Sequence, residues 1–242
     1  SQNPAMIRDT IISMKTYPFS DPNPIPNPGV NYYPYFRFDG FSIEGQDQYW
    51  KVVELENDYI KVSIFPEIGG KIWGAIEKST GNEFIYCNSV VKFRDIAMRG
   101  PWTSGGLELN FGIIGHVPTT STPVDYDIKS NDDGSVSCFI SATDLITRTR
   151  WETEVNLPKD KAYFTTKTTW HNPTPLVQPY YQWINGAFLA GEDLEFCFPG
   201  THSIGHNGRA HEWPVDERRN NLSFYKQNNF EGDKSYHIVG GI

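Results

Sequence analysis

The stretch ITRTRWETEVNL, residues 146–157, decides the fold class, because uncharged and charged side chains alternate along it almost strictly. One face carries Thr147, Thr149, Trp151, Thr153, Val155 and Leu157, and the other carries Arg148, Arg150, Glu152 and Glu154. A period of two is that of a β-strand with one buried face. We therefore expect one long, half-exposed strand here, which the turn residues Pro158-Lys159-Asp160 end.

Further strands are predicted on both sides of this segment, and turn residues separate them. The predicted strands cover residues 51–56, 59–65, 71–77, 162–170 and 177–188, with turns at 57–58, 66–70, 79–82 and 171–175. No helical period of 3.6 residues extends over a dozen positions. Many strands at a spacing of about 8–12 residues predict an all-β sandwich or barrel.

The N-terminal part has a different composition. Five of the seventeen prolines lie between Pro18 and Pro28, and proline fixes φ and removes a backbone donor. We expect residues 1–34 to form an extended lead-in and residues 35–242 to form the β domain. The final SYHIVGGI resembles the start of a strand, so we expect the domain to continue beyond residue 242 in a longer protein.

Charge and composition exclude several classes of partner. The net charge is −8 and no basic block occurs, which disfavours nucleic acid and anionic membrane surfaces. No apolar run approaches the ~20 residues that cross a membrane, so no membrane insertion is expected. Aromatic residues make up 14% of the chain, and aromatic rings both pack on sheets and stack on the C–H faces of sugars.

Residues 98–122, MRGPWTSGGLELNFGIIGHVPTTST, are the densest candidate for a functional site. Long Gly-rich loops on a β scaffold are often functional. Arg, Glu, Asn and His hydrogen-bond sugar hydroxyls and transfer protons. We therefore predict Glu108 and His116 as catalytic residues and Arg99, Trp102 and Asn110 as substrate-binding residues. Glu108 and Asn110 would share one face of a strand. The alternative is a structural loop with an ion pair between Arg99 and Glu108.

A second candidate segment, residues 199–214, contains His202, His206 and His211. The intervening glycines predict a loop, whereas this spacing would place metal ligands together only on a helix. We expect no metal or other cofactor here. His206 is predicted to contact the sugar, and Trp213 could provide a stacking surface. Calcium stays open as an alternative, although a calcium site needs more oxygen ligands than Asp125 and Asp127 supply.

Three motifs resemble the DUF5107 family of bacterial proteins, many of them from gut Bacteroidetes such as Bacteroides. The motifs are PEIGGKIWG (66–74), RGPWTSGGLELNFGIIGHVPTT (99–120) and HNPTPLVQPYYQWINGAF (171–188). The family is similar in turn to the galactose-mutarotase-like superfamily. The resemblance implies a β-supersandwich, incomplete at the C-terminus in this chain. It also implies a secreted or periplasmic location and a C-terminal tetratricopeptide-repeat region as a partner.

The resemblance to mutarotases implies roles for single residues. Arg99, Asn110 and His116 match sugar-facing positions, and Asn172-Pro173-Thr174 matches a turn before the strand that carries the catalytic acid. At that strand the chain departs from the pattern, since Tyr180-Tyr181-Gln182-Trp183 contains no histidine. The general base of mutarotases, a glutamate near the end of the domain, would lie beyond residue 242. Gln182, Trp183 and Asn185 are predicted to shape the site.

Three functions stay open. The first is an enzyme that acts on a sugar, by epimerisation or by cleavage of a glycosidic linkage. The second is a non-catalytic carbohydrate-binding module, in which Trp102, Trp183 and Trp213 stack on sugars. The third is a structural or partner-binding β domain without a ligand. An open grouping of Arg99, Glu108 and His116 would argue against the third.

Overall fold

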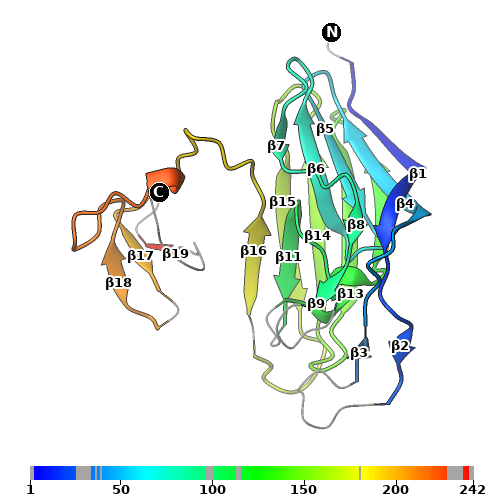
Figure 1. The fold of residues 1–242 in the computed structure, drawn as a ribbon. Coiled ribbons are helices and arrows are strands. Elements are labelled where there is room, and N and C mark those ends of the chain that lie inside the picture. The colour runs from blue at the N-terminus through cyan, green and yellow to red at the C-terminus, as the bar shows by residue number, and fades with distance from the viewer. Residues whose placement is uncertain are drawn as a thin grey trace. The chain divides into compact units, whose positions relative to one another are not determined.

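The computed structural model describes residues 3–25, 34–35, 37–38, 40–95, 101–112, 116–179, 181–205, 207–227 and 237–239. The chain divides into two compact units, Ser1–Phe188 and Leu189–Ile242. Nearly all regular structure is β, so the all-β prediction is confirmed (Figure 1). The helical elements of the described residues are two short 3-10 turns, η1 (Pro118–Ser121) and η2 (Tyr225–Gln227).

The first unit contains two main sheets. In the part of the chain that is described, the larger sheet has eight strands and the smaller has four. The larger sheet runs in the order β16 (Gln182–Gly186), β11 (Leu107–Phe111), β6 (Lys71–Glu77), β5 (Ile60–Phe65), β4 (Gln46–Glu56), β1 (Met6–Tyr17) and β8 (Val91–Lys92), with β7 (Glu83–Ile85) paired to β6. The smaller sheet runs in the order β12 (Asp125–Ser130), β13 (Val136–Thr143), β14 (Arg150–Leu157) and β15 (Thr165–His171). Two two-stranded ladders accompany them, β2 (Pro22–Asn23) with β3 (Arg37–Phe38) and β9 (Arg94–Asp95) with β10 (Pro101–Trp102).

The two main sheets enclose the principal core. Leu109 and Phe111 of the larger sheet pack into one cluster with Trp151 and Val155 of the smaller sheet. The rings of Phe111 and Trp151 stack with centroids 4.6 Å apart. This face-to-face packing makes the first unit a β-sandwich, and Figure 1 shows β13, β14 and β15 behind the larger sheet.

The larger sheet is also buried on its other face. A second apolar cluster there contains Trp50, Val52, Phe65 and Trp73. These residues alternate along their strands with those of the principal core, as the pleat requires. The polar residues described below lie on this second face, which we call the outer face of the larger sheet.

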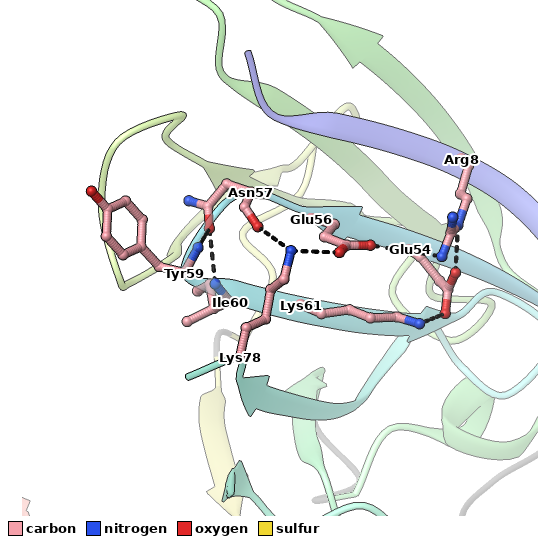
Figure 2. A network of polar contacts seen from close by, with 8 residues as sticks. All are labelled: Arg8, Glu54, Glu56, Asn57, Tyr59, Ile60, Lys61 and Lys78. Atoms are coloured by element: carbon pink, nitrogen blue, oxygen red, sulfur yellow. Dashed lines mark hydrogen bonds and ion pairs between the residues drawn. The ribbon is translucent and has the colours of Figure 1, made fainter. Parts of the chain in front are cut away.

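Polar side chains join three strands of the outer face at one end, as Figure 2 shows. The carboxylate of Glu54 on β4 pairs with Arg8 of β1, Nε to Oε2 at 2.6 Å, and with Lys61 of β5. The side chain of Asn57 accepts hydrogen bonds from the backbone N–H groups of Tyr59 and Ile60. Asn57 therefore closes the turn between β4 and β5 that its sequence predicts.

Several strand boundaries differ from the sequence expectation. Residues 6–17, inside the predicted lead-in, form the long strand β1, which pairs with β4 from Met6↔Glu56 to Thr16↔Gln46. Strand β14 begins at Arg150 rather than at 146, because residues 144–149 form a turn in which Arg148 has φ 62°. The two-face alternation is confirmed, since Trp151, Val155 and Leu157 are buried and Glu152 is exposed.

The second unit contains a small antiparallel sheet. Strand β17 (His202–Ile204) pairs with β18 (Ala210–Glu212) and with β19 (His237–Val239). Trp213 follows β18 and packs edge-on against Phe198, with ring centroids 5.2 Å apart. Only 6% of Trp213 is exposed. Its predicted role as an open stacking surface is therefore wrong, because its ring is part of the small core of this unit.

Candidate functional site

The candidate site lies on the outer face of the larger sheet, where β11 and β16 pair. Glu108 is opposite Asn185, and Asn110 is opposite Trp183. Leu109 and Phe111 point into the principal core, so the alternating Glu108 and Asn110 share the outer face. That shared face is the arrangement expected from their i, i+2 spacing.

Glu108 is the centre of a hydrogen-bonded cluster. Four side chains donate to its carboxylate in the described part of the chain. They are Thr120 to Oε1 at 2.8 Å, Asn185 to Oε2 at 2.9 Å, Trp102 to Oε2 at 3.2 Å, and His116 through Nδ1, 3.0 Å from Oε2 and 3.1 Å from Oε1. The donors come from β10, β16, η1 and the segment between β11 and η1. One carboxylate thus joins four separate segments.

The environment of Glu108 keeps it ionised although it is buried, with 3% exposed. Burial by itself raises the pKa of a carboxyl group. The hydrogen bonds from His116 and Asn185, together with the charges of His116 and Lys71, outweigh burial and lower the pKa of Glu108 to about 2. The low pKa keeps the carboxylate ionised at neutral pH, which suits Glu108 to accept hydrogen bonds.

Lys71 supplies the positive charge next to this carboxylate. Leu107 pairs with Ile72 across β11 and β6, which places the neighbouring Lys71 on the same face as Glu108. Only 2% of Lys71 is exposed. Its ammonium group donates to the carbonyl and hydroxyl oxygens of Thr103 and lies 5.5 Å from the ring centroid of Trp102. Burial lowers the pKa of Lys71 to about 8, against the opposing charge of Glu108.

His116 is held in one orientation and one tautomer. An ionised carboxylate only accepts hydrogen bonds, so Nδ1 of His116 carries the proton and Nε2 keeps its lone pair in the neutral ring. The imidazole lies edge-on to Trp183, with ring centroids 5.1 Å apart, and to Trp102, at 6.2 Å. Glu108 therefore orients the imidazole, and Nε2 is the ring nitrogen of His116 that keeps an acceptor lone pair.

The local backbone explains how these segments come together. Gly69 and Gly70, in the turn before β6, have φ of 67° and 69°. A Cβ on Gly69 would lie 2.7 Å from the backbone of Thr120. The turn can approach η1 this closely only because it has no side chain there. The same contact fixes Thr120 next to Glu108.

The structure brings most of the predicted site residues together, but not all. Glu108, His116, Trp102, Asn110, Trp183 and Asn185 form one cluster. Gln182 is opposite Phe111, so it alternates with Trp183 and lies on the other face. Arg99 and His206 lie outside the described residues. The proposed ion pair between Arg99 and Glu108 therefore stays a prediction.

Two residues of the cluster were not predicted. Lys71 and Thr120 lie in motifs that predicted only a turn and the family resemblance, and neither residue was given a role of its own. A signal for Lys71 was present, since GGKIWG places a lone cation in an otherwise apolar segment. Among the described residues, no three His, Cys, Asp or Glu side chains gather as a metal site. No described helix is long and apolar enough to span a membrane.

The fold and the cluster define a β-sandwich domain in which a buried carboxylate pairs with a partly buried imidazole on the outer face of the larger sheet. Residues 27–242 match the DUF5107 family, described as a domain of unknown function. The chain belongs to this family, as the three motifs indicated.

A solved structure has a similar fold. It is the crystal structure of a TPR-domain containing protein from Parabacteroides distasonis, with a TM-score of 0.76 and 23% sequence identity. The similarity covers 88% of this chain and 37% of that chain. At this identity the similarity shows the fold alone, and this chain spans little more than a third of the length of that relative.

Proposed function

We propose that the outer face of the larger sheet binds a carbohydrate and that His116 exchanges a proton with it. The Glu108–His116 pair with two flanking indole rings carries this proposal. Aromatic rings stack on the C–H face of a sugar, and an oriented imidazole exchanges protons with a hydroxyl group. The similarity to galactose mutarotases belongs to the same proposal, because it rests on motif resemblance alone.

Within this proposal, Glu108 assists His116 in two ways. It keeps the proton on Nδ1, so that Nε2 faces the ligand as an acceptor. It also stabilises the imidazolium that forms when Nε2 takes a proton, because the carboxylate stays charged at neutral pH. Trp102 and Asn185 position Glu108 in turn, through their hydrogen bonds to Oε2.

Two observations favour a second candidate function, a non-catalytic carbohydrate-binding module. The carboxylate of Glu108 is occupied by four donors, and the motif at Tyr181-Gln182-Trp183 lacks the histidine of mutarotases. Such a cluster can serve to shape a rigid binding surface. In that case the repeats of a longer protein, of the kind named for the Parabacteroides structure, would couple sugar binding to a further partner.

Saturation-transfer NMR distinguishes these functions. The panel contains D-glucose, D-galactose, D-mannose, D-xylose, N-acetylglucosamine, D-glucuronate and β-linked disaccharides. We expect saturation transfer to one of these sugars, together with accelerated exchange of its anomeric protons or a new product. His116→Asn should abolish the exchange and keep binding, whereas the exposed Glu152→Gln on β14 should change neither.

Binding by the wild-type chain without exchange or product would select the non-catalytic module. Absence of binding to every sugar of the panel would refute the proposed function in both forms.

A further inference from the structure

Two N–H groups on the outer face have no acceptor among the described residues. They are Nδ2 of Asn110 and Nε1 of Trp183, and both atoms are buried. Asn110 itself is 0% exposed. Its Oδ1 accepts the backbone N–H of Val117 at 2.9 Å, so the unpaired end of the amide is the NH₂ group. Native proteins rarely leave buried donors unpaired, and such an exception calls for a functional explanation.

The two donors belong to one place in the sheet. Asn110 and Trp183 are directly opposite each other on β11 and β16, so their side chains are neighbours on the same face. His116 lies close to this pair. Its ring centroid is 5.1 Å from that of Trp183, and the backbone N–H of the next residue, Val117, donates to Oδ1 of Asn110. Trp151 also has an unpaired Nε1, but it packs in the principal core, away from this face.

We propose that Asn110 and Trp183 form a donor pair that receives one hydroxyl oxygen of the ligand beside Nε2 of His116. This inference rests on the proposed function and specifies which ligand group the site selects. The donor pair requires an oxygen that accepts hydrogen bonds. The Nε2 lone pair requires a group that donates one, because Nδ1 holds the ring proton. A hydroxyl group meets both requirements, whereas a carboxylate, carbonyl or ring oxygen has no proton to donate.

The same arrangement supports proton transfer. The O–H bond of the ligand breaks, the proton binds Nε2 of His116, and the electron pair remains on the oxygen. The oxygen becomes more negative as the proton leaves. The donor pair then stabilises it more strongly than it stabilises the neutral hydroxyl, as donors aimed at a developing oxyanion do. Asn110 and Trp183 thereby select for a hydroxyl at this position.

Ligand entry requires a local side-chain movement, because both nitrogens are shielded from solvent in the unliganded protein. Tyr181 packs edge-on against Trp183 with ring centroids 5.5 Å apart, and it is 41% exposed. Exposed side chains change rotamer on the picosecond to nanosecond scale. Rotation of Tyr181 is the movement that we expect to uncover the indole edge.

The test uses the tightest-binding sugar of the panel and three variants of the full chain. Trp183→Phe keeps a ring next to His116 but removes the N–H, and Asn110→Asp keeps the acceptor for Val117 but removes the donors. We expect each to weaken binding by about tenfold or more, as the loss of a good hydrogen bond to a ligand does. Trp183→Phe should lower the melting temperature less than Trp50→Phe does, since both lose the same ring volume but only Trp50 has a paired N–H.

Trp50→Phe is the matched control. Its indole N–H is already paired, with Thr16 Oγ1 at 2.9 Å. We therefore expect a lower melting temperature and unchanged sugar binding. Independently of any variant, the indole proton of Trp183 in the ¹⁵N-labelled wild-type chain should shift downfield on sugar saturation.

Two results would overturn the donor pair while leaving sugar binding intact. One is a Trp183→Phe affinity equal to that of the wild type, and the other is an indole resonance of Trp183 that does not move at saturation. If the wild-type chain binds no sugar of the panel, the proposed function fails and the donor pair fails with it.

Discussion

At the scale of single residues, the site depends on how the charge of Glu108 is compensated. Leaving a buried carboxylate without partners is strongly unfavourable, and pairing removes most of that penalty. Here the hydrogen-bond donors saturate both oxygens, and Lys71 supplies a nearby cation. Lys71 in turn is held by Thr103 rather than by Glu108. The two charges therefore stabilise each other without a direct ion pair, which leaves the carboxylate free to orient His116.

The low pKa of Glu108 predicts how stability depends on pH. The carboxyl has a pKa of 4.5 when unfolded and about 2 when folded, so the unfolded state binds the proton first as pH falls. The associated stability is complete above about pH 4.5 and is lost towards pH 2. A difference of this size corresponds to roughly 3 kcal/mol. Glu108→Gln lacks this component, and its free energy of unfolding should be lower at pH 7.

Urea unfolding at pH 7, 4 and 3 measures this dependence. The wild-type and Glu108→Gln values should converge as the pH falls, because protonated Glu108 resembles glutamine. Glu152→Gln on the exposed face of β14 should follow the wild type throughout. Parallel curves for the wild type and Glu108→Gln would contradict the low pKa.

At the scale of elements, alternation predicted the strands with one clearly buried face. Strand β14 and the β4–β5 pair with its Asn57 turn were predicted to within a few residues. Strand β1 was not recognised, because MIRDTIISMKTY does not alternate strictly: Ile11 and Ile12 are adjacent, and Ile11 is exposed. Its pairing along β4 stabilises it, and sequence pattern alone does not show such a partner.

The same limit applies to the site. Glu108, Asn110 and His116 stood in one Gly-rich motif and could be selected by residue type. Glu108 and Asn110 are opposite Asn185 and Trp183 of β16, a strand about 75 residues later in the chain. Only the family resemblance suggested that this strand contributes to the site. Lys71 was predicted only as the first residue of a strand that follows a turn. Its burial follows from the approach of β11 to β6, a tertiary contact that no local pattern encodes.

Glu54 on β4 forms ion pairs with both neighbouring strands, β1 and β5, and is 8% exposed, which yields a prediction. Glu54→Gln keeps the size of the side chain but removes the charge that pairs with Arg8 and Lys61. We expect a loss of about 1 kcal/mol in the free energy of unfolding, discounted because Arg8 is largely exposed. The loss should shrink in 1 M NaCl, which screens such pairs.

Urea unfolding at low and high salt measures this effect, and backbone hydrogen exchange should show faster opening of β1. Glu152→Gln is again the control. An equal loss at both salt concentrations would mean that Glu54 acts through hydrogen-bond geometry rather than through charge.

At the scale of the whole molecule, the proposed site belongs to one compact unit. Every described partner of Glu108, and both members of the donor pair, lie within Ser1–Phe188. That unit also contains the principal core, which both main sheets share. The second unit, Leu189–Ile242, has its own small core around Phe198 and Trp213. Only the predicted sugar contact of His206 connects the second unit to the proposed function.

A chain that ends at Phe188 separates these contributions. Because the described contacts of the principal core and of the cluster lie within residues 1–188, we expect this fragment to give a dispersed ¹H–¹⁵N spectrum. The fragment should bind the sugar that the full chain binds, with affinity within about threefold, since it keeps every contact of the cluster that the structure describes. His206→Ala in the full chain tests the predicted sugar contact of His206 directly, and unchanged affinity would remove His206 from the site. A folded fragment that has lost binding, together with weaker binding by His206→Ala, would instead assign part of the sugar site to Leu189–Ile242. In that case the pair Glu108–His116 would form only one side of the site.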